Sequence, residues 1–332
     1  MKVLITGSEG FIGSHLVEEL IKSGYKVRCF VLYNSFNSYG WLNNLEKEIL
    51  NNCEVIFGDI RDSSCVKNAV RGMDVIIHLA ALIGIPYSYT ASESYIDTNI
   101  KGTLNLLNAA KGSNINKFIH TSTSEVFGSA QYLPMNESHP INCQSPYAAS
   151  KAGADSLVMS YKKSFDLPIT ILRPFNSFGP RQSLRAVIPT IISQTLFNHG
   201  KINLGNLKTR RDYTYVKDTT RAFKLAIRNS KCIGQSINIG NNFDISILEI
   251  VKLVEKITGI KIKIVLDSKR VRPKESEVKL LKTSNQKAKK ILNWKPKLNG
   301  KRGFEIGLNN TINWIEDNKK LFSNNQIKKY II

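Results

Sequence analysis

A tyrosine and a lysine stand four residues apart in the segment SPYAASK, at Tyr147 and Lys151. On a helix, positions i and i+4 lie on the same face, about one turn apart. An ammonium group held there favours the phenolate, so we expect Lys151 to lower the pKa of Tyr147 toward the working pH. A tyrosine tuned in this way can take a proton from a sugar or alcohol hydroxyl. Pro146 suits the first turn of this helix, and Ser145 is a candidate for its cap.

A second group of candidate catalytic residues, Thr123, Ser124 and Glu125, follows the apolar run at 118–119. This run is interpreted as a strand, and the strand ends of an open parallel sheet commonly carry catalytic side chains. Thr123 can hydrogen-bond the hydroxyl that Tyr147 deprotonates. Glu125 adds a carboxylate that redox chemistry by a tyrosine and a lysine does not need, so it indicates a further proton transfer.

The spacing of Tyr147 and Lys151 also occurs by chance in many helices, so its interpretation depends on a glycine motif near the N-terminus. A short strand at 2–6 precedes the sequence GSEGFIG, and an amphipathic helix follows it. Gly7 permits a tight turn, Gly10 lets the backbone approach a pyrophosphate, and Gly13 lets helix and strand pack closely. The N-terminus of the helix then faces the phosphates. Strand, glycines and helix together predict a dinucleotide cofactor.

The second strand, expected at 26–33, ends without the acidic residue that usually holds the ribose 2′-hydroxyl of NAD. The residues at 31–34 are Val-Leu-Tyr-Asn. No arginine cluster for a 2′-phosphate is evident either, although Arg28 is nearby. We expect NAD as the cofactor, and the sequence leaves NADP open.

Two further strand ends contribute to the predicted cofactor site. Asp59 follows a strand at 54–57 and can reach the adenine, or it is a solvated turn residue. Small residues follow a strand at 74–79 and let a cofactor lie close, whereas His78 inside that strand is expected to be structural. The predicted cofactor site comprises Gly7, Gly10, Phe11, Ile12, Gly13, Asp59, Ile60, Leu79, Ala80, Ala81, Asn99, Tyr147 and Lys151.

Strands that alternate with helices predict an α/β fold with a doubly wound parallel sheet of the Rossmann type. Strands are expected at 2–6, 26–33, 54–57, 74–79, 118–119, 168–172 and 236–239, and helices at 94–111, 147–165, 186–198, 246–258, 284–294 and 301–317. The dinucleotide-binding domain is expected at 1–174 plus about 214–241. A smaller mixed α/β C-terminal substrate domain is expected at 175–213 and 242–330.

Composition places the 332-residue chain among soluble globular proteins, with 42% hydrophobic and 22% charged residues. No apolar run approaches the roughly 18 residues of a membrane span, and the first residues lack a signal peptide, so we expect a cytoplasmic protein. The five cysteines lack metal-site spacing, and we expect reduced thiols and no metal. The net charge of +21 is spread along the chain without a nucleic-acid motif. We therefore expect neither a nucleic-acid nor a membrane partner, whereas a diphosphate substrate would favour a basic cleft.

With these motifs the whole chain resembles the extended short-chain dehydrogenase/reductase family of nucleotide-sugar enzymes. The triplet Thr123-Ser124-Glu125 is similar to that of sugar-nucleotide 4,6-dehydratases and UDP-glucuronate decarboxylases. The stretches VLYNSFNSYGWL, LAALIGIPYSY and GPRQSLRAVIPTII resemble the dehydratases of legionaminic-acid biosynthesis, which act on a GDP- or UDP-linked N-acetylglucosamine. The other residues that carry the resemblance are Gly7, Gly10, Gly13, Asp59, His78 to Ala81, Tyr147, Lys151, Arg173 to Asn176, Arg211 to Tyr213, Arg272 and Pro273.

The resemblance implies an NAD-dependent nucleotide-sugar 4,6-dehydratase and a homodimer paired through helices around 97–111 and 147–164. Tyr147, helped by Lys151 and Thr123, would deprotonate the hydroxyl on carbon 4. Glu125 would remove the proton on carbon 5, and water would leave carbon 6. Ser124 stands where several dehydratases have Asp, so it joins the predicted catalytic set without an assigned proton transfer.

Arginines and an asparagine form the predicted substrate site. Arg211 and Arg272 are candidates to clamp a diphosphate, because guanidinium binds phosphate oxygens in a bidentate fashion. Arg185 is a further candidate, and each of the three can instead be a solvated surface residue. Asn176 follows a strand end and can hydrogen-bond the substrate, or it only forms a turn. Val187 completes the predicted site.

Other functions share this set of residues. A 4-epimerase on the same scaffold needs Tyr147 but not Glu125. A decarboxylase needs a cation for the uronate carboxylate, which the sequence does not fix. A non-catalytic nucleotide-binding regulator is a third alternative, against which the intact set of Thr123, Tyr147 and Lys151 argues.

Overall fold

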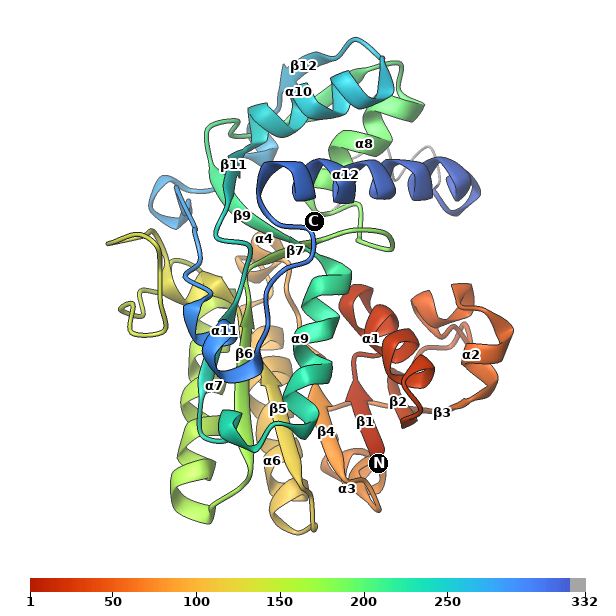
Figure 1. The fold of residues 1–332 in the computed structure, drawn as a ribbon, viewed down its shortest axis with the longest axis vertical. Coiled ribbons are helices and arrows are strands. Elements are labelled where there is room, and N and C mark those ends of the chain that lie inside the picture. Colours follow the sequence, from red (N-terminus) through yellow and green to blue (C-terminus); the bar gives the residue numbers. More distant parts are fainter. Residues whose placement is uncertain (323–332) are drawn as a thin grey trace.

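Seven parallel strands form the central sheet of the protein (Figure 1). The computed structural model describes residues 1–322. Across the sheet the strands follow the order β10-β6-β5-β4-β1-β2-β3, which reverses direction between β1 and β4. This order confirms the doubly wound sheet, and a crevice opens at such a reversal. The strands are β1 (Lys2–Thr6), β2 (Lys26–Leu32), β3 (Cys53–Gly58), β4 (Val75–His78), β5 (Lys117–Thr121), β6 (Ile169–Pro174) and β10 (Ser236–Ile239).

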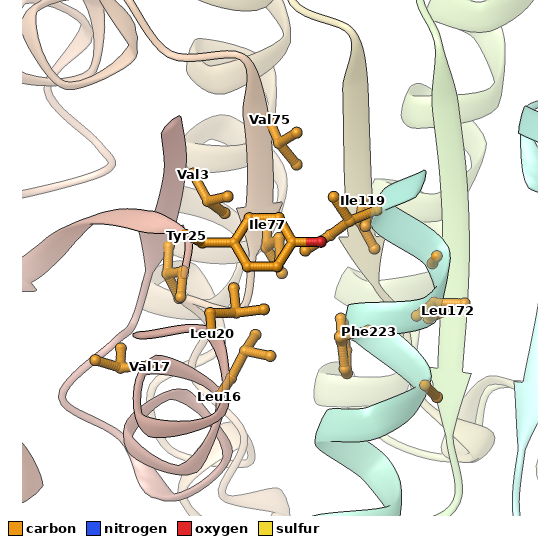
Figure 2. Packing of buried hydrophobic residues seen from close by; sticks show 14 of the residues in the cluster. Val3, Leu16, Val17, Leu20, Tyr25, Val75, Ile77, Ile119, Leu172 and Phe223 are labelled. Carbon is orange, nitrogen blue, oxygen red and sulfur yellow. The ribbon is translucent and has the colours of Figure 1, made fainter. Parts of the chain in front are cut away.

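Alternating side chains of the strands fill two separate hydrophobic cores, one on each face of the sheet. Val3, Ile77 and Ile119 point to the face covered by α1 (Phe11–Lys22) and α9 (Val216–Arg228). Figure 2 shows this core, in which Leu16 and Leu20 of α1 and Phe223 of α9 meet the strands. The neighbouring Leu4, Ile76 and Phe118 pack on the opposite face against α3 (Ser63–Val70), α6 (Gly102–Lys111) and α7 (Pro146–Phe165). Both faces of a parallel sheet are thus buried, as its apolar strands require.

Helix α7 carries the tyrosine and lysine, and its start is built as expected. The side-chain oxygen of Ser145 accepts a hydrogen bond from the Ala148 amide at 3.1 Å, and Pro146 occupies the first helical turn. The helix ends at Asp166, whose backbone is left-handed with φ of 52°. Tyr147 and Lys151 are therefore fixed in the first turns of a capped helix.

Two segments differ from the expected elements. The helix expected at 94–111 consists of α5 (Ser92–Tyr95), a π-helical turn at Ile96–Lys101, and α6. Helix α9 was not anticipated, because it follows strand β9 (Arg210–Tyr215) without a connecting loop. The apolar residues Ala222, Phe223, Ala226 and Ile227 of α9, which are all buried, have helical spacing and were a usable signal.

A second lobe lies beyond the carboxyl ends of the central strands (Figure 1). It contains a three-stranded sheet, a two-stranded sheet and three helices around a third hydrophobic core. Its elements are β7 (Asn176–Phe178), α8 (Val187–Phe197), β8 (Lys201–Leu204), β9, β11 (Asp244–Ser246), α10 (Ile247–Thr258), β12 (Lys263–Leu266) and α12 (Gly300–Asp317). The remaining helices are the short α2 (Lys47–Asn51), α4 (Ile85–Ser88) and α11 (Gln286–Leu292).

The chain returns to the first lobe between the two halves of the second. Helix α9 packs against α1, and β10 pairs with β6 at the edge of the central sheet. These contacts place α9 and β10 in the first lobe, as the proposed division does for about 214–241. Ala288, Leu292 and Trp294, which the division assigns to the substrate domain, also pack in the core of the first lobe. Residues 323–330 of the proposed substrate domain lie outside the described residues. Within residues 1–322, no helix combines the length and apolar character needed to cross a membrane.

Candidate active site

A cavity of about 810 Å³ runs from the glycine-rich turn of the first lobe to the second lobe. The carboxyl ends of β1, β2, β3, β4, β5 and β6 open into it, which is the position that the reversed strand order predicts. Of the residues proposed from the sequence, all but Ser124 and Asn99 line this cavity. The fold therefore gathers residues that are up to 265 positions apart, from Gly7 to Arg272, around one space.

The proposed catalytic side chains lie together at the middle of the cavity. Thr123 and Glu125 follow β5, and Tyr147 and Lys151 reach the cavity from α7. Thr123 caps the short helical turn Ser124–Phe127, and its hydroxyl accepts a hydrogen bond from the Glu125 amide at 3.3 Å. This turn directs Thr123 and Glu125 to the cavity, whereas Ser124 is buried outside it.

Burial controls the ionisation of the tyrosine and the lysine. It raises the pKa of Tyr147, although a hydrogen bond with Thr123 opposes this shift; the charge of Glu125 adds to it. Burial also lowers the pKa of Lys151 to about 8, against the attraction of Asp155. The expectation that Lys151 brings the tyrosine pKa toward the working pH is thus wrong for the protein by itself, because the cost of burying a phenolate outweighs the hydrogen bond with Thr123.

A buried charge network supports this site, and the sequence reasoning missed it. Asp155 lies one helical turn after Lys151 on α7 and contacts Ser122 Oγ at 2.5 Å, Arg173 Nη2 at 2.9 Å and His120 Nε2 at 3.2 Å. Burial opposes ionisation of Asp155, but its contacts with His120 and Arg173 hold its pKa below the usual range. An acid at i+4 from the lysine, followed by an arginine at a strand end, was the available signal.

The network joins α7 to the ends of two strands. Ser122 directly precedes Thr123, and Arg173 belongs to the last residues of β6. Arg173 also donates to Ser122 Oγ at 3.2 Å. Asp155 therefore fixes the helix that carries Tyr147 relative to the turn that carries Glu125.

The glycine-rich turn forms one end of the cavity together with the ends of β3 and β4. Gly7 has φ of +68°, and a Cβ atom there would lie 2.8 Å from the Ala80 backbone, so only glycine fits this approach. Gly10, Phe11, Ile12 and Gly13, together with Asp59, Ile60, Leu79, Ala80 and Ala81, line this end. Asp59 pairs with Arg61 at 2.5 Å, which lowers the Asp59 pKa.

A dinucleotide fits the residues at this end. The glycine turn leads directly into α1, whose free amides favour a phosphate. The cavity continues without interruption to Tyr147 and Lys151. A space that joins a phosphate site to a buried tyrosine in this way suits a nicotinamide dinucleotide.

Asn99 supports the cavity from outside. Its side chain accepts a hydrogen bond from the Leu82 amide and donates to the Leu82 carbonyl, both at 2.9 Å, and it donates to Ser150. It thereby holds the segment after β4 against α7. His78 is also buried beneath the site, between Thr6 Oγ1 at 2.8 Å and Thr103 Oγ1 at 3.0 Å, which agrees with the structural role expected for it.

The second lobe supplies cations to the other end of the cavity. Arg185, Arg211 and Arg272 line the cavity, as do Asn176 and Val187. Glu277 lies between two of the arginines, with its Oε1 3.7 Å from Arg211 Nη2 and 4.0 Å from Arg272 Nη1. The Asn176 side-chain oxygen and Arg272 Nη1 are buried without hydrogen-bond partners in residues 1–322.

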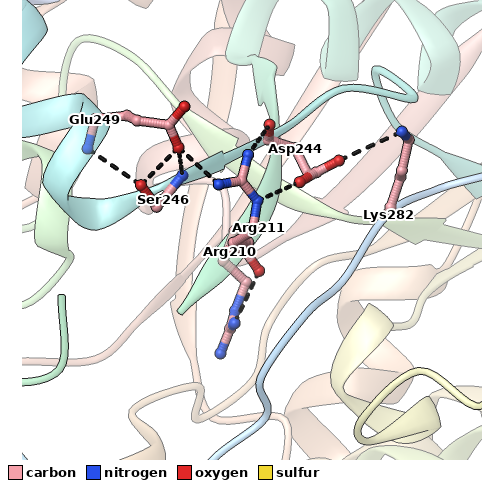
Figure 3. Close-up of polar contacts among 6 residues, drawn as sticks. All are labelled: Arg210, Arg211, Asp244, Ser246, Glu249 and Lys282. Carbon is pink, nitrogen blue, oxygen red and sulfur yellow. Dashed lines mark hydrogen bonds and ion pairs between the residues drawn. The ribbon is translucent and has the colours of Figure 1, made fainter. Parts of the chain in front are cut away.

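The neighbouring Arg210 shows why Arg211 faces the cavity. Arg210 donates to Asp244 at 2.6 Å and to Glu249 at 2.7 Å, and Ser246 and Glu249 cap α10 in the same cluster. Figure 3 shows the side chain of Arg211 directed away from this cluster. Successive residues of strand β9 point to opposite sides, so the anchoring of Arg210 turns Arg211 into the cavity.

The chain is similar in sequence to nucleotide-sugar 4,6-dehydratases. Residues 4–306 match the family model for GDP-mannose 4,6 dehydratase. A dTDP-D-glucose 4,6-dehydratase of Dictyostelium discoideum is 37% identical over 273 residues, which cover 77% of this chain and 62% of that protein.

Two solved structures are similar over almost the whole chain. One is a dTDP-glucose 4,6-dehydratase of Bacillus anthracis in complex with NAD, with 30% identity, a TM-score of 0.83, and coverage of 97% of this chain and 98% of that one. The other is a UDP-glucuronic acid 4-epimerase of Bacillus cereus in complex with UDP-glucuronic acid and NAD, with 31% identity, a TM-score of 0.85, and coverage of 97% and 100%. Because the family match extends over most of the sequence and the two solved structures are similar over 97% of the chain, the chain belongs to the GDP-mannose 4,6-dehydratase family of nucleotide-sugar enzymes.

Proposed function

We propose that the protein is an NAD-dependent 4,6-dehydratase that converts a GDP- or UDP-linked N-acetylglucosamine to its 4-keto-6-deoxy derivative. The observation that carries this proposal is the position of Glu125. Its carboxylate lines the same cavity as Thr123, Tyr147 and Lys151. An epimerase has no use for an additional base beside the tyrosine, whereas an elimination requires one.

The first proton transfer uses the residues of α7. Tyr147 takes the proton from the hydroxyl on carbon 4 as the phenolate, a form that burial disfavours in the protein by itself. The nearby Lys151 and Thr123, together with the positive charge of a bound oxidised nicotinamide, would stabilise this form. NAD, when bound, would supply the hydride chemistry for the oxidation at carbon 4 and the later reduction at carbon 6. The residues from Gly7 to Gly13 would hold its phosphates, and those after β3 and β4 would hold its adenosine half.

The elimination uses Glu125. The ketone on carbon 4 acidifies the hydrogen on carbon 5, and Glu125 removes this proton. Glu125 then gives the proton to the departing hydroxyl of carbon 6, which leaves as water. Ser124 does not line the cavity, so Glu125 serves as both base and acid. Tyr147 still holds the proton from carbon 4 and delivers it to carbon 5 when carbon 6 is reduced, which balances the reaction.

Arginines of the second lobe support a nucleotide-diphosphate substrate. Arg211 and Arg272 lie on either side of Glu277, so a diphosphate would replace a carboxylate as their shared anion. Arg185 lines the same cavity and is exposed enough to move toward the ligand. The N-acetylglucosamine unit is proposed from the resemblance to the dehydratases of legionaminic-acid biosynthesis.

A 4-epimerase is the second candidate function. It is favoured by the similarity to the UDP-glucuronic acid 4-epimerase, which extends over 97% of the chain. The two reactions share the oxidation at carbon 4 and differ in the next step. Epimerisation returns the hydride to carbon 4 and leaves the mass of the sugar unchanged.

Mass spectrometry of the products separates the two functions. The protein is incubated with GDP- and UDP-N-acetylglucosamine, and we expect a product lighter by one water without net accumulation of NADH. Glu125→Gln should slow the loss of water by at least about 100-fold, because a general base is removed, while the affinity for NAD is retained. A product of unchanged mass with altered configuration would establish the epimerase instead.

We further propose a cytoplasmic location and a homodimer. All five cysteines are free thiols, as a reducing compartment allows. The dimer is proposed from the family resemblance, with α6 and α7 of two subunits pairing. Light scattering should then give twice the 37.3 kDa mass of the chain, and a monomeric mass would exclude the pairing.

A further inference from the structure

The glycine-rich turn contains an acidic residue, Glu9, that the site described above does not use. Glu9 lines the cavity between Gly7 and Gly10. Its Oε1 accepts a hydrogen bond at 3.0 Å from the amide of Leu32, the last residue of β2. The carboxylate of Glu9 is therefore held at the end of β2, where the sequence itself provides no acid.

The segment after β2 fixes Glu9 in this place. The Trp41 amide donates to the Glu9 carbonyl at 3.0 Å. Gly40, with φ of +54°, passes so close that a Cβ atom on it would lie 3.0 Å from the Cβ of Glu9. Asn34 closes the intervening loop by donating to the carbonyls of Leu32 and Ser38. Glu9 is thus held both at its backbone carbonyl, by the Trp41 amide, and at its carboxylate, by the Leu32 amide.

The carboxylate lacks a compensating charge. Its Oε2 is buried and has no hydrogen-bond partner within residues 1–322, and no cation pairs with it there. Burial raises the pKa of Glu9, although the Leu32 amide opposes the shift. A buried acceptor without a donor costs free energy, and such groups are generally kept where a ligand supplies the missing donor.

We propose that Glu9 accepts hydrogen bonds from the adenosine ribose of the cofactor and makes the protein select NAD over NADP. In dinucleotide-binding folds the ribose hydroxyls lie at the end of β2, beside the glycine turn. The Glu9 carboxylate reaches that place from the turn itself and replaces the missing strand-end acid. A 2′-phosphate there would meet a carboxylate, and the nearby Arg61 is already paired with Asp59.

The inference rests on the NAD site of the proposed function but not on which sugar reaction follows. It is tested by calorimetric titration of the nucleotide-free protein with NAD, NADP and 2′-deoxyadenosine-NAD. Wild type should bind NAD at least about 10-fold more tightly than the 2′-deoxy analogue, because a hydrogen bond to a charged group is lost. Glu9→Gln should erase this difference and reduce the preference for NAD over NADP by about 100-fold.

Two variants control for charge and for folding. Glu48→Gln removes an exposed acid from α2, near the same loop, and should leave all three affinities unchanged. Leu32 lines the cavity at the strand end and is 56% exposed. Leu32→Asp added to Glu9→Gln should restore the preference for NAD, because it returns a carboxylate to the end of β2.

The possible failures are distinct. If wild type binds NAD and its 2′-deoxy analogue equally, the inference is overturned even if Glu9→Gln does not fold. An unchanged NAD/NADP ratio in Glu9→Gln, with only a lower melting temperature, would show that Glu9 merely anchors the loop after β2. If wild type binds neither NAD nor NADP, the cofactor of the proposed function is overturned as well.

Discussion

At the scale of single residues, Lys151 lies in a buried position that disfavours its charged form. Burial lowers its pKa to about 8 from an ordinary value of 10.5. Between these two values the unfolded chain binds the proton and the folded protein does not. The free energy of unfolding therefore rises with pH across this interval, and below about 8 the full cost of the buried ammonium is present.

This linkage predicts a stabilising substitution at the active site. Lys151→Met should abolish turnover and yet raise the free energy of unfolding at pH 7 by up to about 3 kcal/mol, because the cost of burying the ammonium is removed. Urea unfolding of the nucleotide-free protein at pH 7 and at pH 10 measures the effect. Lys252→Met, on an exposed position of α10, is the control for the loss of one charge. A variant less stable than wild type at pH 7 would contradict the prediction.

At the scale of elements, the geometry of the site depends on how α7 is joined to β5 and β6. The connection is made by the contacts of Asp155 on α7 with Ser122, Arg173 and His120. Burial lowers the pKa of His120 to about 4, so at pH 7 the network has one positive and one negative charge. Removal of one member of such a buried pair leaves the other charge without compensation.

Asp155→Asn should therefore destabilise the protein by about 3–5 kcal/mol at pH 7, because Arg173 stays buried without its counter-charge. The low native pKa of Asp155 means that its stabilising contribution is present above the unfolded pKa, ordinarily 3.8, and disappears as the pH falls through the native value. Thermal unfolding measures the loss.

The control for this prediction is Asp166→Asn at the end of the same helix. Asp166 is exposed and pairs only with Lys162 on the surface, and asparagine also tolerates its left-handed backbone. This change should leave stability nearly unaltered. Equal effects of the two substitutions would show that the buried network does not hold α7 in place.

At the scale of the whole molecule, the cavity is bounded by two lobes, so a ligand that contacts both should stabilise the folded chain. At 100 times its dissociation constant, GDP or UDP should add about 2.7 kcal/mol to the free energy of unfolding. We expect a higher melting temperature in scanning fluorimetry with the nucleotide that the enzyme uses. The nucleotide that gives no shift is then not part of the substrate.

The arginines of the second lobe provide the test of this coupling. Replacement of both Arg211 and Arg272 by alanine should remove the nucleotide-dependent shift in melting temperature. The diphosphate would then lack the two cations that Glu277 contacts in the protein without ligand. Arg302→Ala on the exposed side of α12 is the matched control. A full shift in the double variant would place the diphosphate elsewhere.

The sequence by itself determined much of the first lobe. The glycine spacing at Gly7, Gly10 and Gly13, the alternation of strands and helices, and the cap at Ser145 are local features, and the structure shows each of them. Local patterns can be read in a sequence because the backbone conformations and helix ends they encode depend on neighbours along the chain.

Tertiary structure alone decided the surroundings of the side chains. Asp155 meets Ser122 and Arg173 across 33 and 18 positions of the chain, and Glu9 meets Leu32 across 23. The tertiary structure also reversed the expected pKa shift of Tyr147, because the desolvation of the phenol depends on all the groups that pack around it. Burial and long-range contact are properties of the folded chain, so the sequence could propose catalytic residues but could not give their ionisation or the residues that support them.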